Sequence, residues 1–461
     1  MTLTIRHCGA IYRGVLLLCV LTAAAQNAAA PPTLADLVKR PYLDLVQLAP
    51  SLDFPKKAID DFRKQLEISK KEDIDGLESE KKALKTQEDD ARKQLDEMNR
   101  SASIDTPEMS KRRTDLHCKL YQIDADLRDS KTERSISIPV DYDHRLTKLE
   151  IIAQWPARKR DADQAVANGK ARARHWGDID DIGFRKIGEN QEADVKLGED
   201  AVNELRAYRL LPAETDSPAL RAYVSDLAHR IAGASDLKIP LRVAVLDSPE
   251  INAFGLPGGR LLVDTGLVAR AANESELAGV LAHEIAHIAA RHGEKLTRPT
   301  SSVPRMLLQG VTMAADAFTG GAVGTARSAA HNVLGLGVHL NLSLLGVNRE
   351  TEAEAGQLAT QYLWKAGYDP RAFMRFYDKM VSDPVHTQTS SFFRTHPPSV
   401  DRALISLAEL EYLPRTKAKP IIDSPRFQRI HVVVEAWLKT HRAAMAPNPP
   451  ECTAAASPAA K

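Results

Sequence analysis

Apolar side chains are sparse over residues 56–135 and recur at helical spacing among many Lys, Arg, Asp and Glu residues, beginning with Ile59, Phe62 and Leu66. A narrow apolar seam surrounded by charge predicts a coiled coil or a helical hairpin. Two interpretations of this arm stay open. Either it is a solvated spacer, or it docks a coiled-coil partner or mediates self-association.

The pattern changes at about residue 187 and becomes that of a compact domain that extends to residue 415. Amphipathic helical spacing alternates there with short β-rich runs at Leu241–Leu246 and Arg260–Val263. The sequence therefore predicts an α+β fold that is mostly helical and contains a small β-sheet. The other segments are predicted as a linker (26–55), a helical connector (136–186), a C-terminal helical extension (416–445) and a disordered tail (446–461).

The first 25 residues have the pattern of a secretory signal peptide. Arg6 and Arg13 precede a short apolar run, Val15–Leu21, and Ala23–Ala25 supply small residues for cleavage. The run is too short to span a bilayer comfortably, and an uncleaved membrane anchor is the alternative. We expect an exported protein of the periplasm or the membrane-associated envelope of a bacterium.

Charge and composition narrow the choice of partners. The chain has 62 basic and 61 acidic residues and a net charge of +1, whereas a nucleic-acid binder usually has a strong basic excess. We therefore expect no nucleic-acid partner. Ser328–Asn348 contains no charged residue, but Gly335 and Gly337 weaken a helix there. We interpret it as a buried or membrane-touching amphipathic segment near the cleft, which adds a peripheral membrane contact to the expected partners, and a true membrane span is the alternative.

A metal-binding motif lies inside a predicted helix that begins after Asn273. His283 and His287 are four residues apart, so both imidazoles project from one helix face and can bind a single Zn²⁺. Glu284 is rotated by about 100° from His283, which places it beside the metal as the base for an attacking water. A catalytic zinc needs a third protein ligand. The acidic helix start at Arg349–Gly356 offers several glutamates without distinguishing among them.

The surroundings of this motif resemble the HtpX and CAAX-prenyl-protease family of gluzincin metallopeptidases, in its periplasmic BepA-like branch. The resemblance covers roughly residues 187–415. It rests on four segments in the family's order, namely Asn252–Leu267, Leu281–Gly293, Arg349–Gly356, and Thr395-His396-Pro397 with Arg402. It implies a gluzincin-type zinc metalloprotease domain with one Zn²⁺ per chain.

The resemblance also implies roles for single residues. It places the third ligand at Glu352 and brings His396 near the active site, as an inhibitory fourth ligand or as a hydrogen-bond donor to the transition state. A loop histidine with a structural role is the alternative for His396. Asn252, Ala253, Phe254 and Gly255 would pair with an extended substrate by β-addition, which recognises backbone more than sequence.

One position departs from the family. Gly356 stands where the family usually has an aspartate that supports a ligand histidine, and loss of such a partner typically lowers metal affinity or activity by about 10–100-fold. Two functions therefore stay open. The first is a zinc-dependent metalloendopeptidase that hydrolyses unfolded or misassembled envelope proteins. The alternative is a catalytically weak or inactive protease-like binder that uses the cleft and the coiled-coil arm.

Overall fold

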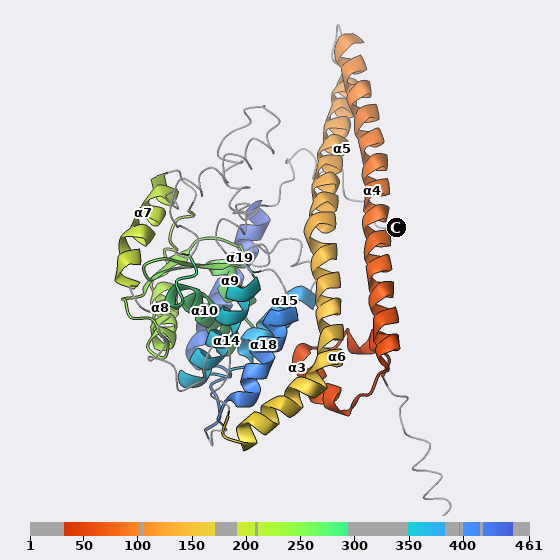
Figure 1. The fold of residues 1–461 in the computed structure, drawn as a ribbon. Helices are drawn as coiled ribbons and strands as arrows, with labels where there is room; N and C mark the ends of the chain where they lie inside the picture. The colour runs from red at the N-terminus through yellow and green to blue at the C-terminus, as the bar shows by residue number, and fades with distance from the viewer. Residues whose placement is uncertain are drawn as a thin grey trace, which may run out of the picture. The chain divides into compact units, whose positions relative to one another are not determined.

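The computed structural model describes residues 32–101, 106–170, 191–207, 211–293, 349–382, 396, 400–414 and 418–445 (Figure 1). The predicted signal peptide, the predicted disordered tail and the segment Ser328–Asn348 lie outside these residues. The chain divides into two units, Met1–Arg40 and Pro41–Lys461. In the first unit, the short helix α2 (Leu34–Leu37) begins with a capping box at Thr33. Everything below concerns the second unit.

Helices dominate the second unit, and three short strands form its one described sheet. The helices before the sheet are α3 (Tyr42–Leu48), α4 (Lys56–Ser101), α5 (Pro107–Thr132), α6 (Ile138–Ala167), α7 (Asp194–Ala207) and α8 (Pro218–Ala232), with the 3₁₀ turns Ala49–Ser51 and Gln191–Ala193. The strands are β1 (Arg242–Leu246), β2 (Ala253–Leu256) and β3 (Arg260–Asp264). The later helices are α9 (Thr265–Arg270), α10 (Glu274–Ala289), α14 (Arg349–Lys365), α15 (Ala372–Ser382), α18 (Val400–Tyr412) and α19 (Pro425–Met445). The predicted α+β, mostly helical fold is confirmed.

The charged region forms two long helices that pack along each other (Figure 1). Helix α4 is 46 residues long, and α5 starts at Pro107 after the N-cap Thr106, whose hydroxyl accepts from the N–H of Met109. A five-residue π-helical stretch, Glu133–Ser137, joins α5 to α6. The buried apolar positions are few and recur along the pair, including Leu66 and Leu116.

The sheet has the order β1-β3-β2, with β1 parallel to β3 and β2 antiparallel to it. Gly258 and Gly259, both at positive φ (74° and 77°), form the turn between β2 and β3. This arrangement places β2 at an edge of the sheet, beside helix α10. The β-rich runs predicted at Leu241–Leu246 and Arg260–Val263 coincide with β1 and β3 to within one residue at each end.

Helix α10 lies at the centre of the core and packs against β2, α8, α14 and α15. Its N-cap Asn273 accepts a hydrogen bond from the N–H of Glu276, as the sequence predicts. All of its side chains are buried, including two histidines and three glutamates. Buried ionisable groups are costly unless they find partners, so α10 carries polar groups that the tertiary structure must satisfy. Within the described residues, no helix is long and apolar enough to cross a membrane.

Candidate metal centre

The two histidines of the motif point at the same place. His283 and His287 project from successive turns of α10, and their Nε2 atoms lie 3.0 Å apart. Both side chains are buried. The ring of His283 stacks on Phe373 of α15, with 4.6 Å between ring centroids. Neighbouring helices therefore hold the ring orientation that the helical spacing predicts.

Glu352 of α14 completes the set of three. Its Oε2 lies 3.3 Å from His283 Nε2, and its Oε1 lies 3.1 Å from His287 Nε2. The side chain is fully buried. Of the glutamates at the start of α14, Glu352 is thus the one that α14 presents to both rings, while Glu354 contacts His292 instead.

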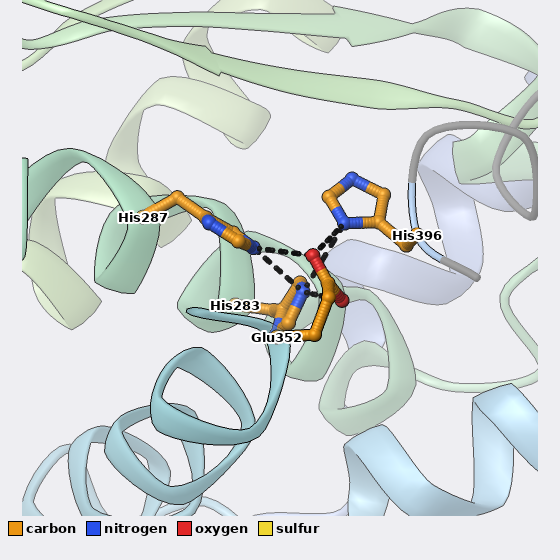
Figure 2. A group of neighbouring side chains, drawn as sticks. All are labelled: His283, His287, Glu352 and His396. Carbon is orange, nitrogen blue, oxygen red and sulfur yellow. Dashed lines mark hydrogen bonds and ion pairs between the residues drawn. The ribbon is translucent and has the colours of Figure 1, made fainter. Parts of the chain in front are cut away.

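His396 also joins this cluster, from the segment before α18. Its Nδ1 lies 2.9 Å from Glu352 Oε1 and 3.4 Å from His283 Nε2, while its Nε2 lies 3.2 Å from Glu284 Oε1. Figure 2 shows the four side chains converging. Among the described residues, one ligand atom from each of the four lies within 4.8 Å of the others. We call His283, His287, Glu352 and His396 the metal cluster.

The donor set of the metal cluster fits zinc. Ligand atoms about 2.0–2.2 Å from a tetrahedral zinc are about 3.3 Å from one another, and the distances above are 2.9–3.4 Å. Burial and the nearby charge of Arg402 hold the pKa of His283 well below its usual range, so its imidazole is neutral. Neutral imidazole and ionised carboxylate are the forms that bind metal.

Arg402 of α18 keeps Glu352 in that ionised form. Its Nη1 lies 2.7 Å from Glu352 Oε2 and donates to the backbone carbonyl of His396 at 3.2 Å. Burial alone raises the pKa of Glu352, but the Arg402 guanidinium and the cluster histidines outweigh it and hold the pKa well below its usual range. The same guanidinium connects Glu352 to the backbone that carries His396.

Comparison with known proteins agrees with this geometry. Residues 215–410 match the model of peptidase family M48. The chain carries a peptidase family M48 domain. It is 29% identical over 214 residues to a putative beta-barrel assembly-enhancing protease of Vibrio cholerae (45% of this chain, 43% of that protein). The corresponding values for the beta-barrel assembly-enhancing protease of Escherichia coli are 24% over 272 residues (53% and 52%).

A mitochondrial relative is similar over a comparable length. The chain is 32% identical over 234 residues to the mitochondrial metalloendopeptidase OMA1 of Schizosaccharomyces pombe, which is 49% of this chain and 62% of that protein. The chain spans about half the length of the curated bacterial relatives it matches. The predicted resemblance to gluzincin metallopeptidases of the HtpX and CAAX-prenyl-protease family, in its BepA-like branch, is thereby confirmed.

In the M48 domain, Glu284 lies between His396 and strand β2. Its Oε2 accepts a 2.9 Å hydrogen bond from the backbone N–H of Gly255. A Cβ atom at Gly255 would lie 2.6 Å from the carbonyl oxygen of Glu284. Only glycine lets the strand approach α10 this closely. Gly255, predicted to bind substrate, therefore also positions the predicted base.

The other predicted substrate-binding residues lie along the same edge strand. Asn252 and Ala253 are buried, and Phe254 is half-buried. The N–H of Asp264 bonds to the carbonyl of Asn252. Because hydrogen-bonded pairs alternate along an antiparallel ladder, the backbone groups of Ala253 and Gly255 point away from β3. The side-chain oxygen of Asn252 accepts a hydrogen bond from the backbone N–H of Ala253.

Sequence reasoning missed the role of His292. The side chain of this residue is buried, and its Nδ1 lies 2.8 Å from His287 Nδ1. Its Nε2 lies 3.2 Å from Glu354 Oε2. The clue was a histidine just past the metal helix together with a glutamate two residues after Glu352. The local sequence pattern does not predict that the chain after α10 brings the His292 ring back to the His287 ring.

Proposed function

We propose that the chain is a zinc-dependent endopeptidase that hydrolyses peptide bonds of unfolded or misassembled proteins in a bacterial envelope. The observation that carries the proposal is the convergence of two imidazoles and one carboxylate on one point beside Glu284. The M48 domain supports the reaction class. The names of the bacterial relatives, beta-barrel assembly-enhancing proteases, support envelope protein quality control as the setting.

The chain's own residues supply the proton chemistry. A zinc ion held by His283, His287 and Glu352 would supply Lewis acidity to the attacking water and the scissile carbonyl. Glu284 takes the proton of that water and delivers it to the leaving amine. The N–H of Gly255 fixes one carboxylate oxygen of Glu284, so the other oxygen faces the reacting groups.

His396 acts as a gate in this proposal. A catalytic zinc keeps one position open, yet His396 Nδ1 lies among the ligand atoms and its Nε2 lies beside Glu284. The ring thus occupies the space that a water and a substrate carbonyl need. A ring displaced from the ligand atoms could donate a hydrogen bond to the transition state. His396→Ala should change basal cleavage or zinc retention, and no change in either would refute the gate.

Strand β2 is the proposed substrate platform. The outward carbonyls of Ala253 and Gly255 lie on the side of the strand that faces away from β3. An extended peptide can pair with such an edge whatever its sequence, which suits unfolded chains as substrates. The export pattern at residues 1–25 supports a periplasmic or membrane-associated location.

The test uses the purified chain with zinc and unfolded casein. We expect cleavage by the wild type and a loss of about 10²–10⁴-fold in Glu284→Gln, because that is the usual contribution of a general acid–base. Zinc content should be equal in the two proteins, since Glu284 is not among the proposed ligands. Equal turnover by both would refute the mechanism.

One observation favours the second candidate, a binder with weak or no activity. Among the described residues, His283 Nδ1 has no hydrogen-bond partner, and Gly356 carries no side chain that could supply one. A ligand histidine without such a partner binds metal less tightly. Under this alternative, the chain would suppress aggregation of unfolded casein, Glu284→Gln would do so equally well, and neither would cleave it.

A further inference from the structure

We propose that Glu354, His292 and His287 form a hydrogen-bonded relay that orients the metal ligand His287 and fixes the position of its proton. The inference rests on the proposed function in one respect, that the metal cluster binds zinc. It adds two positioning residues to the site. It also identifies where this chain has a supporting carboxylate, although position 356 is glycine.

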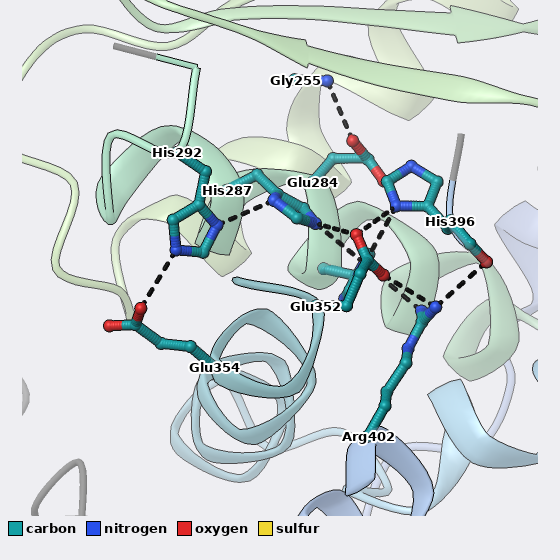
Figure 3. Close-up of polar contacts among 9 residues, drawn as sticks. Gly255, Glu284, His287, His292, Glu352, Glu354, His396 and Arg402 are labelled. Carbon is teal, nitrogen blue, oxygen red and sulfur yellow. Dashed lines mark hydrogen bonds and ion pairs between the residues drawn. The ribbon is translucent and has the colours of Figure 1, made fainter. Parts of the chain in front are cut away.

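The three side chains lie in a row (Figure 3). His287 Nδ1 is 2.8 Å from His292 Nδ1, and His292 Nε2 is 3.2 Å from Glu354 Oε2. The two rings cross at 76° with 4.8 Å between their centroids. The side chains are 6%, 1% and 7% exposed for His287, His292 and Glu354, so water does not compete freely for these contacts.

The donor and the acceptor of each hydrogen bond in the relay follow from the nitrogen of His287 that binds the metal. Nε2 of His287 faces Glu352 and His283, so metal binding requires its lone pair there and its proton on Nδ1. That proton can be donated to His292 only if Nδ1 of His292 is an acceptor. The proton of His292 then lies on Nε2, where it is donated to the Glu354 carboxylate. Only one arrangement of protons satisfies both contacts.

The backbone holds His292 in this place. Arg291 adopts φ 57°, the left-handed conformation that ends α10, and its guanidinium pairs with both carboxylate oxygens of Asp194 at 2.7 and 2.8 Å. The N–H of His292 bonds to the carbonyl of His287 at 3.0 Å. The chain therefore reverses direction at the end of α10, which places the His292 ring beside the His287 ring.

The relay serves one of the two ligand histidines. His287 contacts His292 through Nδ1, whereas Nδ1 of His283 has no hydrogen-bond partner among the described residues. A carboxylate that orients a metal-bound histidine raises the basicity of the ligand, and losing it typically costs about 10–100-fold in metal affinity. Among the described residues, the carboxylate support for a ligand histidine is therefore the one that Glu354 gives to His287 through His292.

Zinc affinity of the full chain, measured by competition with a chelator, tests the relay. Glu354→Gln keeps the side-chain shape but removes the charge, and His292→Asn keeps an acceptor for His287 but cannot reach Glu354. Each variant should bind zinc about 10–100-fold more weakly than the wild type. The double variant should lose no more than His292→Asn alone, because the carboxylate is already disconnected there.

Glu409→Gln is the matched control. Glu409 is a buried carboxylate on α18 that accepts from Gln357 and Gln361 of α14 at 2.7 and 2.8 Å. Its zinc affinity should equal that of the wild type. The relay is overturned if either relay variant binds zinc normally, if the two losses add, or if Glu409→Gln loses as much.

Nitrogen NMR of the zinc-loaded chain shows which ring nitrogen of His287 and of His292 carries the proton. A purely structural role of His292 and Glu354 would not determine these positions. The expected spectrum has protons on Nδ1 of His287 and Nε2 of His292, and a proton on Nδ1 of His292 would overturn the relay. These measurements do not depend on cleavage. A chain that binds zinc through the relay but cleaves nothing would contradict the proposed function alone.

Discussion

Two buried clusters of ionisable side chains contact helix α15, the metal cluster through Phe373 and a second cluster through Asp378, and they differ in which polar atoms face one another. The second, which we call the α6–α15 cluster, consists of Tyr42, His144, Lys148 and Asp378. Tyr42 Oη lies 2.7 Å from His144 Nδ1. His144 Nε2 and Lys148 Nζ lie 3.2 and 3.1 Å from Asp378 Oδ1.

In the α6–α15 cluster, hydrogen-bond donors face acceptors, so we call it complementary. In the metal cluster, acceptor atoms face one another, so we call it convergent. In the first, each donor faces an acceptor, and the Lys148 charge offsets that of Asp378. In the second, His283, His287 and Glu352 direct acceptor atoms at one point. Complementary polar atoms complete a fold by themselves, whereas convergent acceptors require a cation. This difference distinguishes a structural cluster from a site.

Helix α15 connects the two. Phe373 stacks on His283, and Asp378 lies five residues later at the contact with α3 and α6. Helix α6, which follows the arm, therefore packs against the helix that supports the His283 ring. The comparison predicts that changes in one cluster abolish metal binding and changes in the other reduce stability.

The largest expected effect is on metal binding by Glu352→Gln. Zinc affinity should fall by more than about 100-fold, because even an outer partner of a ligand contributes about 10–100-fold. Casein cleavage should disappear with it. Metal analysis after dialysis and the cleavage assay measure both effects. Normal zinc content in Glu352→Gln would break the distinction between the clusters.

Asp378→Asn should act on stability instead. Removing one partner of a buried ion pair leaves Lys148 uncompensated and costs about 3–5 kcal/mol of unfolding free energy. Denaturant unfolding of the metal-free chain measures this cost. Zinc affinity should stay within about threefold of the wild type, since a stable fold still presents the ligands. A loss of zinc affinity as large as that of Glu352→Gln would contradict this.

Gly255→Ala should affect the position of the base. The added methyl overlaps the Glu284 carbonyl at 2.6 Å, so strand β2 must shift, at a cost of about 1–3 kcal/mol. Cleavage should fall while zinc content stays normal. Gly76→Ala on α4 is the matched control, because its Cβ meets nothing within 4 Å. It should stabilise the chain by about 0.5–1 kcal/mol, and equal effects of the two variants would exclude the steric explanation.

The α6–α15 cluster should also make stability depend on pH. Burial lowers the pKa of His144 below its usual value, although Asp378 opposes this. The unfolded chain therefore binds a proton that the folded chain does not, so unfolding free energy should decrease as pH falls below about 6.5. Unfolding curves at successive pH values measure the slope, and His144→Gln should flatten it. An unchanged slope would exclude His144 as its source.

Burial raises the pKa of Asp378, but hydrogen bonding to His144 and the charge of Lys148 outweigh it and lower the pKa. The stability contributed by its ionised form is present above about pH 3.9 and is lost as pH falls through the lower folded-state pKa. Asp378→Asn should therefore remove the most acidic part of the decline, and His144→Gln the part nearer neutrality.

The smallest expected effect comes from Gly356. A side chain there meets Ser406 Oγ first and Arg402 next, so the informative variant is Gly356→Asp with Ser406→Ala, compared with Ser406→Ala alone. A restored carboxylate should raise zinc affinity by up to about tenfold. Unchanged affinity would show that the departure at Gly356 does not limit metal binding.

Several features of the site follow from local sequence. The cap at Asn273 and the spacing of His283, Glu284 and His287 fix a helix and the relative directions of three side chains, because helical hydrogen bonds determine positions four residues apart. The strands β1 and β3 were predictable from their alternating or β-rich composition. The sparse apolar spacing of the arm favoured a coiled coil or a helical hairpin, and α4 and α5 pack along each other.

Contacts between elements were not predictable in this way. The choice of Glu352 over its neighbours needed the family resemblance, because it depends on the rotation of α14 against α10. The approach of Gly255 to Glu284 and the return of His292 beneath its own helix depend on packing and on one left-handed residue. Hydrogen bonds within a helix join residues that are close in the sequence, so local residue types predict them. Contacts between side chains that are distant in the sequence depend instead on how helices and strands pack their apolar faces together. The sequence alone therefore determined the motif, and the tertiary structure determined its partners.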